Sequence, residues 1–162
     1  MILKYQKIRE DVIVPTRSNP SDAGLDLYYN PSRDPGRMSP GVMNYEVTTI
    51  CLEPGHAAIL QTGIKLEVPH GYMFEIKNRS SIASKRKLIV GACVVDAGYS
   101  GEIFINLINV GNKRVKLVSG DKIAQGVLVP VVSFRLLEGK VYEDPVCISG
   151  RGAGGFGSTD EK

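Results

Sequence analysis

The segment Gly91-Ala-Cys-Val-Val-Asp-Ala-Gly-Tyr-Ser-Gly-Glu102 predicts a strand, a tight turn and a second strand. Its valines favour an extended backbone, and its glycines, together with Asp96, favour the turn. The backbone N–H and C=O groups of such a hairpin form a fixed pattern that the edge of a nucleobase can match. Asp96 is a candidate to accept a proton from water, and Tyr99 is a candidate to pack on a sugar. Taken alone, a plain turn is the simpler explanation of both residues.

The rest of the chain repeats this pattern of short strands between turns. Such spacing predicts an all-β sandwich, jelly roll or barrel. Helix signals are confined to the segment from Ser80 to Lys87, where a serine is expected to cap one or two turns. The segment between Tyr29 and Tyr45 holds three prolines and two glycines and predicts a long surface loop. The expected strands are residues 2–8, 47–52, 57–68, 72–76, 88–95, 102–110, 115–118 and 123–132.

Length and charge limit the possible classes of protein. A chain of 162 residues suits one domain that buries roughly 70% of its unfolded surface, here residues 1–149, followed by a flexible arm at 150–162. A net charge of +3 is too small to indicate a nucleic-acid footprint, so no direct nucleic-acid binding is expected. Basic residues nonetheless cluster at 77–87 and 113–116. Such clusters form either solvated faces or surfaces that steer a polyanionic small molecule.

The cysteines and histidines follow no metal-binding pattern. Cys51, Cys93 and Cys147 are odd in number and widely spaced, which indicates reduced thiols, not a disulfide framework or a zinc site. His56 and His70 also lack ligand spacing and are expected to have structural or surface roles. The N-terminus carries no signal-peptide pattern, and no apolar run approaches the length of a membrane span. We therefore expect a cytoplasmic protein without a membrane partner.

The last fourteen residues, 149–162, combine five glycines with a few polar and aromatic side chains. Glycines can turn consecutive N–H groups inward and form an anion-binding nest that includes Gly157. Arg151 adds a planar donor group suited to phosphate, and Ser158 and Thr159 add hydroxyls. Phe156 offers a flat face on which a base can stack. The alternative is a disordered glycine-rich end.

Three further segments carry residues that suit phosphate or metal chemistry. Residues 21–27 place Asp26 after a glycine, where it either faces a cation or belongs to an ordinary turn. Residues 77–82 place Arg79, Ser80 and Ser81 at the expected helix start, which suits either a phosphate or plain N-capping. Residues 120–126 contain Gln125, whose amide is able to reach a phosphate.

Taken in order, the five segments resemble the five motifs of the homotrimeric dUTPase family (dUTP nucleotidohydrolases). The resemblance runs from about Ser21 to Thr159. It implies a jelly-roll-like, distorted β-barrel with one short helix, in a homotrimer with three active sites at subunit interfaces. The glycine-rich C-terminal arm of another chain would close each site. The matching stretches are AGLDL at 23–27, RSS at 79–81, VDAGYSGE at 95–102, GDKIAQ at 120–125 and RGAGGFGST at 151–159.

The resemblance also implies a reaction. Water would attack the α-phosphorus of dUTP and give dUMP and pyrophosphate, which limits uracil incorporation into DNA and supplies dUMP for dTTP synthesis. Asp96 would position and deprotonate the water, and Mg²⁺ would bridge the triphosphate oxygens with Asp26 as an outer-sphere contact through water. Tyr99 would pack on deoxyribose, the hairpin from Cys93 to Phe104 would bind uracil through its backbone, and Phe156 would stack above the base. The implied substrate-binding residues are Arg79, Ser80, Ser81, Cys93, Val95, Tyr99, Phe104, Gln125, Arg151, Phe156, Gly157, Ser158 and Thr159.

Several positions depart from the family pattern without removing a chemical group. A proline is common where this chain has Asn78, a small or neutral pair where it has Arg86-Lys87, and a smaller residue where it has Cys93. Gly126 stands in place of a bulkier apolar residue, and Asp160 in place of a final glycine.

Two alternatives compete with this hypothesis. dCTP deaminase shares the fold and similar second and third motifs, but it carries a glutamate base where this chain has Asn106, which cannot act as one. A non-enzymatic scaffold or regulatory binder would use the segment between Tyr29 and Tyr45 to contact an unknown protein partner. The presence of Asp96, Tyr99 and Arg151 favours the enzyme.

Overall fold

The computed structural model describes residues 1–32 and 48–139. The chain divides into two compact units, Met1–Val132 and Ser133–Lys162. Of the second unit, residues 133–139 are described, and all of their side chains are exposed. The predicted boundary between a domain at 1–149 and an arm at 150–162 lies outside the described residues.

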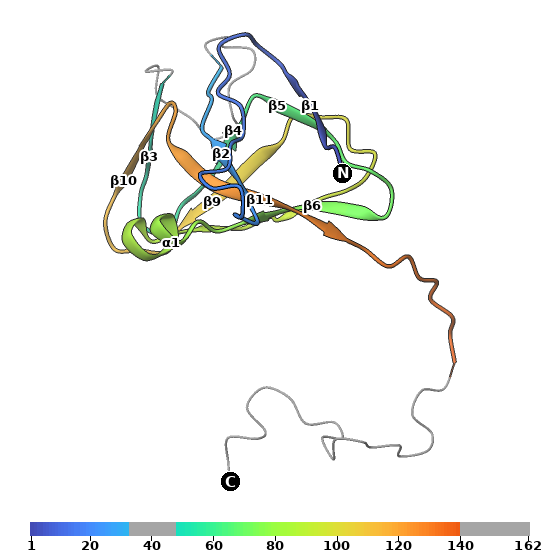
Figure 1. Cartoon of the computed structure of the whole chain (residues 1–162). Helices are drawn as coiled ribbons and strands as arrows, with labels where there is room; N and C mark the ends of the chain where they lie inside the picture. Colours follow the sequence, from blue (N-terminus) through green and yellow to red (C-terminus); the bar gives the residue numbers. More distant parts are fainter. Residues whose placement is uncertain (33–47, 140–162) are drawn as a thin grey trace. The chain divides into compact units, whose positions relative to one another are not determined.

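The first unit is built from short β-strands and one short helix in its described part (Figure 1). The predicted all-β class is therefore confirmed. The elements are β1 (Lys4–Lys7), β2 (Leu25–Tyr28), β3 (Thr49–Leu52), β4 (Ala57–Gln61), β5 (Ile64–Glu67), β6 (Tyr72–Lys77), α1 (Ser80–Arg86), β7 (Leu88–Val90), β8 (Val94–Val95), β9 (Phe104–Asn109), β10 (Val115–Val118) and β11 (Lys122–Pro130).

The strands form four small antiparallel sheets. Their orders are β1-β5, β10-β3, β2-β11-β6-β8 and β4-β9-β7. Figure 1 shows β11 between β2 and β6, with α1 near one end of β10. Two of the strands predicted from the sequence are each divided in two. The run at 57–68 turns at Gly63, whose φ of 70° suits glycine, and the run at 88–95 is divided between β7 and β8.

One hydrophobic core fills the unit, and every sheet contributes to it. The side chains alternate between core and outer face along β9, which is the two-residue period of a strand with one buried face. The run at 127–132 is continuously apolar, as in a fully buried strand, although Pro130 requires a strand edge or a bulge there. The residues at 127–129 are only half-buried, and Pro130 ends the strand. Core side chains with no exposed surface include Leu60, Leu88, Ile105, Leu107, Leu117 and Ile123.

Gly126 and Phe74 pack against each other inside the four-stranded sheet. A Cβ atom at Gly126 would lie 2.0 Å from Cζ of Phe74, so the ring occupies the space of the missing side chain. Phe74 is 1% exposed. The absence of a bulky residue at 126 is thus explained by the aromatic ring on the neighbouring strand.

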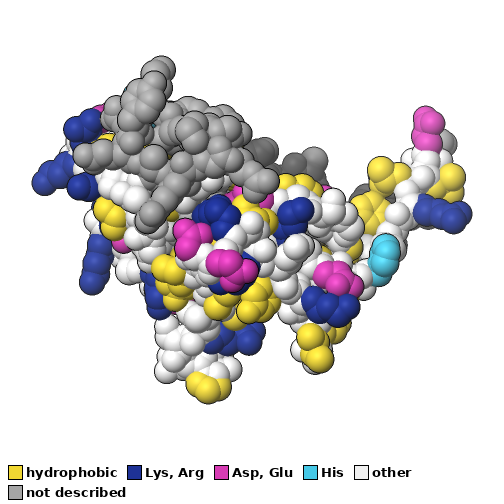
Figure 2. All heavy atoms as spheres, turned by 90° about the horizontal axis from the view of Figure 1, so that it is seen from above, with side chains coloured by type: hydrophobic (Ala, Val, Ile, Leu, Met, Phe, Trp, Pro, Cys, Tyr) yellow, Lys and Arg dark blue, Asp and Glu magenta, His cyan; other side chains and the backbone are white. Residues whose placement is uncertain are grey.

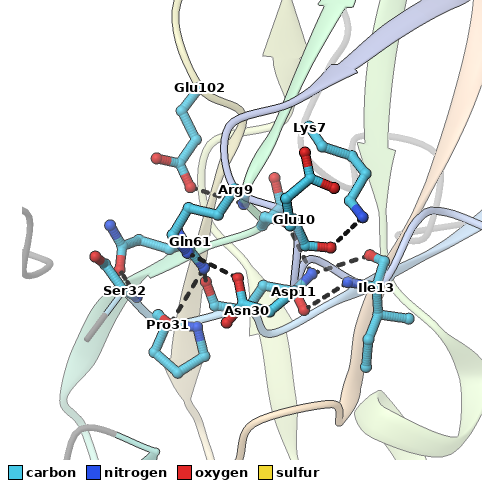
Figure 3. A network of polar contacts seen from close by, with 12 residues as sticks. Lys7, Arg9, Glu10, Asp11, Ile13, Asn30, Pro31, Ser32, Gln61 and Glu102 are labelled. Atoms are coloured by element: carbon cyan, nitrogen blue, oxygen red, sulfur yellow. Dashed lines mark hydrogen bonds and ion pairs between the residues drawn. The ribbon is translucent and has the colours of Figure 1, made fainter. Parts of the chain in front are cut away.

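A buried polar network fixes the chain just before residue 33 (Figure 3). Asn30 is 5% exposed, and its side-chain amide donates to the carbonyls of Ile13 and Thr62 at 3.0 and 2.8 Å. Arg9 Nη2 donates to the Asn30 carbonyl at 2.9 Å, and the Ser32 N–H donates to Gln61 Oε1 at 2.8 Å. Residues 29–32 therefore belong to the folded body. The predicted surface loop is wrong for these first residues, and the rest of that segment lies outside the described residues.

The surface carries mixed charge. On the face seen in Figure 2, basic and acidic side chains lie among each other, with hydrophobic side chains scattered between them. That face therefore presents no field of a single sign. In the described part of the chain, α1 is the only helix, and at seven residues it is too short to cross a membrane.

Candidate functional site

A polar cleft of about 260 Å³ gathers residues from three of the segments singled out in the sequence. Asp26 comes from β2, Arg79 and Ser80 from the start of α1, and Gln125 from β11. The pairing of β2 with β11, in which Gln125 lies opposite Asp26, brings the first and fourth segments together. The sequence prediction that these side chains share a site is consistent with this geometry. The remaining lining residues are Ser18, Asp22, Ala23 and Gly24.

Arg79 is anchored in the cleft by Asp26. Its Nε donates to Asp26 Oδ1 at 2.7 Å, and Nη1 lies 3.5 Å from the Ser81 hydroxyl. Asp26 is 8% exposed, so this ion pair is largely shielded from water. Because Asp26 takes the Nε edge, the outer edge of the guanidinium keeps donors for an anion.

Lys122 is a member of this cluster that the sequence analysis did not single out. Its Nζ lies 2.7 Å from Asp26 Oδ2 and 5.8 Å from the centre of the Tyr28 ring. A bulge in β11 between Lys122 and Ala124 shifts the register there. No local sequence signal predicts this contact, because it depends on which strand pairs with β11 and in which register.

The two cations set the protonation state of Asp26. Burial alone would raise the pKa of the Asp26 carboxyl, but the hydrogen bonds from Lys122 and Arg79, with their charges, lower the pKa below its ordinary value of 3.8. The hydrogen bond to Asp26 in turn raises the pKa of Lys122. Asp26, Arg79 and Lys122 together carry one net positive charge, while Asp22 adds one negative charge to the lining of the cleft.

Gln125 is held against the loop that precedes α1. Its Nε2 donates to the Asn78 carbonyl at 2.9 Å, and Asn78 Oδ1 accepts from the Val90 N–H at 2.7 Å. A Cβ atom at Gly24 would lie 2.6 Å from Gln125 Oε1, so the glycine leaves the space that this amide occupies. Asn78 therefore joins β7 and β11 to the segment that precedes α1.

The start of α1 differs from the sequence prediction in one respect. The N-cap residue is Arg79, in an extended conformation and without a side-chain capping bond. The prediction that a serine caps the helix is wrong, because Ser80 is the first helical residue. Its side chain is exposed and lines the cleft. Arg86, at the other end of α1, pairs with Asp121 at 3.0 Å.

The predicted strand, turn and strand form at 93–104, but the prediction that they make a hairpin is wrong, because β8 and β9 belong to different sheets. β8 pairs with β6, and the Cys93 carbonyl accepts from the Ile76 N–H at 2.7 Å. Asp96 is exposed at the turn, where its carbonyl accepts from the Tyr99 N–H at 3.2 Å. Val95 is half-buried against the core.

Tyr99 is fixed in place but keeps part of its ring exposed. Its hydroxyl donates to the Glu102 carbonyl at 2.9 Å, and a Cβ atom at Gly101 would lie 2.4 Å from that hydroxyl. The glycine therefore lets the ring fold back over the turn. Tyr99 and Phe104 are 45% and 39% exposed, so both aromatic rings offer surface to a ligand or to another chain.

The predicted site residues within the described ranges fall into two groups. Asp26, Arg79, Ser80 and Gln125 line the cleft, with Ser81 behind Arg79. Cys93, Val95, Asp96, Tyr99 and Phe104 lie on the segment 93–104, which runs from β8 to the start of β9, and none of these lines the cleft. A third group, Arg151, Phe156, Gly157, Ser158 and Thr159, lies outside the described residues.

The cleft does not supply a ready-made metal cage. Within residues 1–32 and 48–139, no three His, Cys, Asp or Glu side chains come together as ligands. Both oxygens of Asp26 are engaged by cations, and Oδ2 also accepts from the Ser18 hydroxyl at 3.5 Å, so Oδ1 is the oxygen with a lone pair left for a water molecule. The cleft therefore fits a magnesium ion held mainly by its substrate's oxygens and touched by Asp26 through water, and it does not fit a directly bound ion.

Comparison with known proteins identifies the family. The dUTPase family model matches residues 10–160. A deoxyuridine 5′-triphosphate nucleotidohydrolase of Clostridium tetani is 35% identical over 97% of this chain and 95% of its own length. A protein of the same name from Clostridioides difficile is 33% identical over 97% and 96%. This chain therefore belongs to the dUTPase family.

Solved structures agree with this fold. A single-substitution variant of the dUTPase of Staphylococcus bacteriophage 80alpha, determined with dUpNHpp, has a TM-score of 0.77 and 24% identity, and the match covers 98% of both chains. A dUTPase variant from phage phi11 of S. aureus, described with a structural Mg(II) ion, has a TM-score of 0.72 and 24% identity, over 89% of this chain and all of that one. At this identity the likeness shows the fold alone.

Proposed function

We propose that this chain hydrolyses dUTP to dUMP and pyrophosphate. The observation that carries the proposal is the anchoring of Arg79 by Asp26 in a cleft that also holds Ser80 and Gln125. A guanidinium, a hydroxyl and an amide together supply donors for the oxygens of a triphosphate. Family membership, with the five motifs in order, supports dUTP as the nucleotide.

The chain's own side chains account for the chemical step. Asp96 accepts a proton from water, whose oxygen attacks the α-phosphorus as the bond to the bridging oxygen of pyrophosphate breaks. Arg79 and Gln125 bind the phosphate oxygens on which negative charge develops. The exposure of Asp96 supports this role, because a water molecule can reach its carboxylate.

The proposed substrate is the complex of dUTP with Mg²⁺. When bound, Mg²⁺ neutralises part of the charge of the triphosphate and fixes its conformation. Asp26 would contact it through water, and Arg79 and Lys122 hold Asp26 in the ionised form that such a contact would require.

The working enzyme is a homotrimer in which the segment 93–104 of one subunit completes the cleft of another. The separation of Asp96 from the cleft within one chain supports this arrangement. So does the outer face of β4-β9-β7, where Ile59 lies opposite Asn106 and is 37% exposed. In the described part of the chain, the buried Oδ1 of Asn106 has no hydrogen-bond partner, as expected where a neighbour is missing.

The backbone of the segment 93–104 selects the base. Uracil presents an N3–H donor between two acceptors, whereas cytosine presents an acceptor beside an amino donor. Fixed amides between Cys93 and Phe104 cannot satisfy both, and each unpaired buried group costs about 1–3 kcal/mol. Phe156 and Arg151 of the arm close over the bound nucleotide. The enzyme acts in the cytoplasm, where it limits uracil incorporation into DNA and supplies dUMP for dTTP synthesis.

The direct test is turnover by the purified full-length chain with Mg²⁺. We expect dUMP and pyrophosphate from dUTP, and a kcat/KM for dCTP at least roughly 100-fold lower. Similar kcat/KM for the two nucleotides would contradict the uracil-selective site. Release of ammonia from dCTP would show that the protein is a dCTP deaminase. The absence of any reaction with either nucleotide would favour a binding protein without enzymatic activity.

A further inference from the structure

The two basic clusters of the sequence meet in one surface hollow at the C-terminal end of α1. The hollow has a volume of about 500 Å³ and lies between the end of α1 and the turn that joins β9 to β10. Its lining includes no acidic and no aromatic residue. Six of its lining residues are basic: Lys85, Arg86, Lys87, Lys113, Arg114 and Lys116.

Most of this positive charge is not neutralised by the protein. Arg86 pairs with Asp121, and Arg114 pairs with Glu53. Across the described ranges, none of the four lysines has an ion pair. The helix dipole favours basic residues in the last turn of α1, but it does not account for those of the β9–β10 turn. Uncompensated ammonium groups from two separate segments therefore share one hollow.

Lys87 occupies a backbone conformation that glycine usually takes. It follows the last residue of α1 with φ of 55° and ψ of 34°. It is the one residue other than glycine with a positive φ in the part of the chain that the structure describes. A lysine there is strained relative to glycine, and such strain is common where a side chain serves a ligand.

The opposite wall of the hollow makes room for this lysine. A Cβ atom at Gly111 would lie 2.8 Å from Cβ of Lys87, so only a glycine fits beside that side chain. The Lys87 carbonyl accepts from the Val110 N–H at 2.9 Å, which joins the end of α1 to the β9–β10 turn. The position of Lys87 is therefore set from both sides.

The β9–β10 turn is itself held by a fully buried side chain. Asn109 has no exposed surface, its Nδ2 donates to the Lys113 carbonyl at 2.8 Å, and its Oδ1 accepts from the Gly111 N–H at 3.0 Å. Arg86 also donates from Nη2 to the Lys116 carbonyl. The backbone that carries the lysines is thus fixed before any ligand arrives, which lowers the entropy lost on binding.

We propose that this hollow is a second anion site, which binds a small polyphosphate such as pyrophosphate or the triphosphate chain of a nucleotide. Several ammonium groups in one hollow match several phosphate oxygens at once. The absence of an aromatic lining residue removes the stacking surface that single-stranded nucleic acids use. The site is separate from the cleft, since the two share no lining residue and lie at opposite ends of α1.

The test measures tripolyphosphate binding by titration calorimetry, in EDTA, to full-length protein carrying Arg79→Ala so that the cleft contributes little. Lys87→Gly and Lys113→Gln, each added to this background, should weaken binding at least tenfold. Lys65→Gln is the matched control, because Lys65 has no ion pair among the described residues and lies outside the hollow. It should change the affinity less than twofold. Pyrophosphate and dUTP, titrated separately, distinguish the free anion from a nucleotide as the source of the phosphates.

Lys87→Gly supplies a second, independent readout. Removing the strain should raise Tm while it weakens anion binding, whereas a lysine with no ligand role would show only the first effect. Introduced alone into the otherwise unchanged chain, Lys87→Gly should leave the turnover of dUTP within about twofold of the parent, so a loss of anion binding would not reflect damage to the cleft. Binding unaffected by both lysine variants would overturn the proposal. So would tight binding of a single-stranded 20-mer, lost in the same variants, without binding of tripolyphosphate.

Discussion

Lys122 Nζ lies 2.7 Å from Asp26 Oδ2, on the carboxylate oxygen that Arg79 leaves free. Asp26 is thus held between two cations from two different segments of the chain. The ion pair with Lys122 holds Oδ2 of Asp26 in place, and Oδ1 of Asp26 in turn holds the Arg79 guanidinium. Lys122 is therefore linked to Arg79 through Asp26, and in the proposed function it acts on the phosphates through this contact as well as through its charge.

Lys122→Met should weaken the binding of dUTP more than it slows the chemical step. Loss of its charge leaves the cluster neutral and Asp26 free to rotate, so KM should rise roughly tenfold while kcat changes little. Steady-state kinetics at two salt concentrations measure this effect. Lys122→Arg should restore most of the affinity. Equal losses of kcat in the Met and Arg variants would contradict a role in orienting Arg79.

Asp26→Asn should change how stability depends on pH. The folded pKa of Asp26 is lowered, so its carboxylate contributes stability above its ordinary pKa of 3.8, and this contribution is lost as pH falls through the folded pKa. The parent should therefore exceed the variant in unfolding free energy at neutral pH, and the gap should narrow below about pH 4. Urea titrations between pH 7 and pH 3 test this. A gap that is constant with pH would show that the ion pairs are not the cause.

Asp96→Asn should abolish most turnover and leave nucleotide binding intact. The change removes basicity with almost no change in shape, so kcat should fall roughly 10²–10⁴-fold. Isothermal titration with a non-hydrolysable dUTP analogue checks binding, and size-exclusion chromatography checks whether the variant keeps the oligomeric state of the parent, which we propose is a trimer. Asp11→Asn is the control, because it alters an exposed carboxylate outside the segment 93–104. An Asp96 variant within a few-fold of the parent would remove this residue from the mechanism.

Deleting residues 150–162 should slow hydrolysis without unfolding the protein. The arm is glycine-rich and has little to bury, whereas Arg151 and Phe156 are expected to complete the closed site. We expect kcat/KM to fall by roughly 100-fold or more at an unchanged Tm. Phe156→Ala should show a milder defect. A large fall in Tm on deletion would mean that the arm is structural.

Gly126→Ala should destabilise the fold, because its new methyl group would overlap the Phe74 ring. Overpacking of this kind costs about 1–3 kcal/mol. In the double variant with Phe74→Leu, the two losses should be less than additive, because the smaller side chain gives the methyl group space. Urea unfolding of the four proteins measures the coupling. Strictly additive losses would show that the ring moves aside at no cost.

The sequence predicts well those features that depend on neighbouring residues. The turn that carries Asp96 and Tyr99, the short helix at Ser80 and the positions of most strands follow from local signals, whereas the partners of β8 and β9, which lie in different sheets, do not. The contact between Lys122 and Asp26 does not, because it needs the pairing of β2 with β11 and the bulge that shifts its register. Local composition also misled at Tyr29 and Asn30. Prolines nearby suggested a loop, whereas both side chains are buried by residues distant in sequence.

The close contact between Gly24 and Gln125 has a consequence for how the family can vary. Because the amide of Gln125 fills the space beside Gly24, any side chain at position 24 displaces the amide. In a saturation mutagenesis screen for function, substitutions at Gly24 should therefore be as harmful as substitutions at Gln125, although Gly24 has no side chain that could bind a ligand. Substitutions at Gly24 in natural relatives should be accompanied by a shorter residue at the position of Gln125, a covariation that can be sought in sequence data alone.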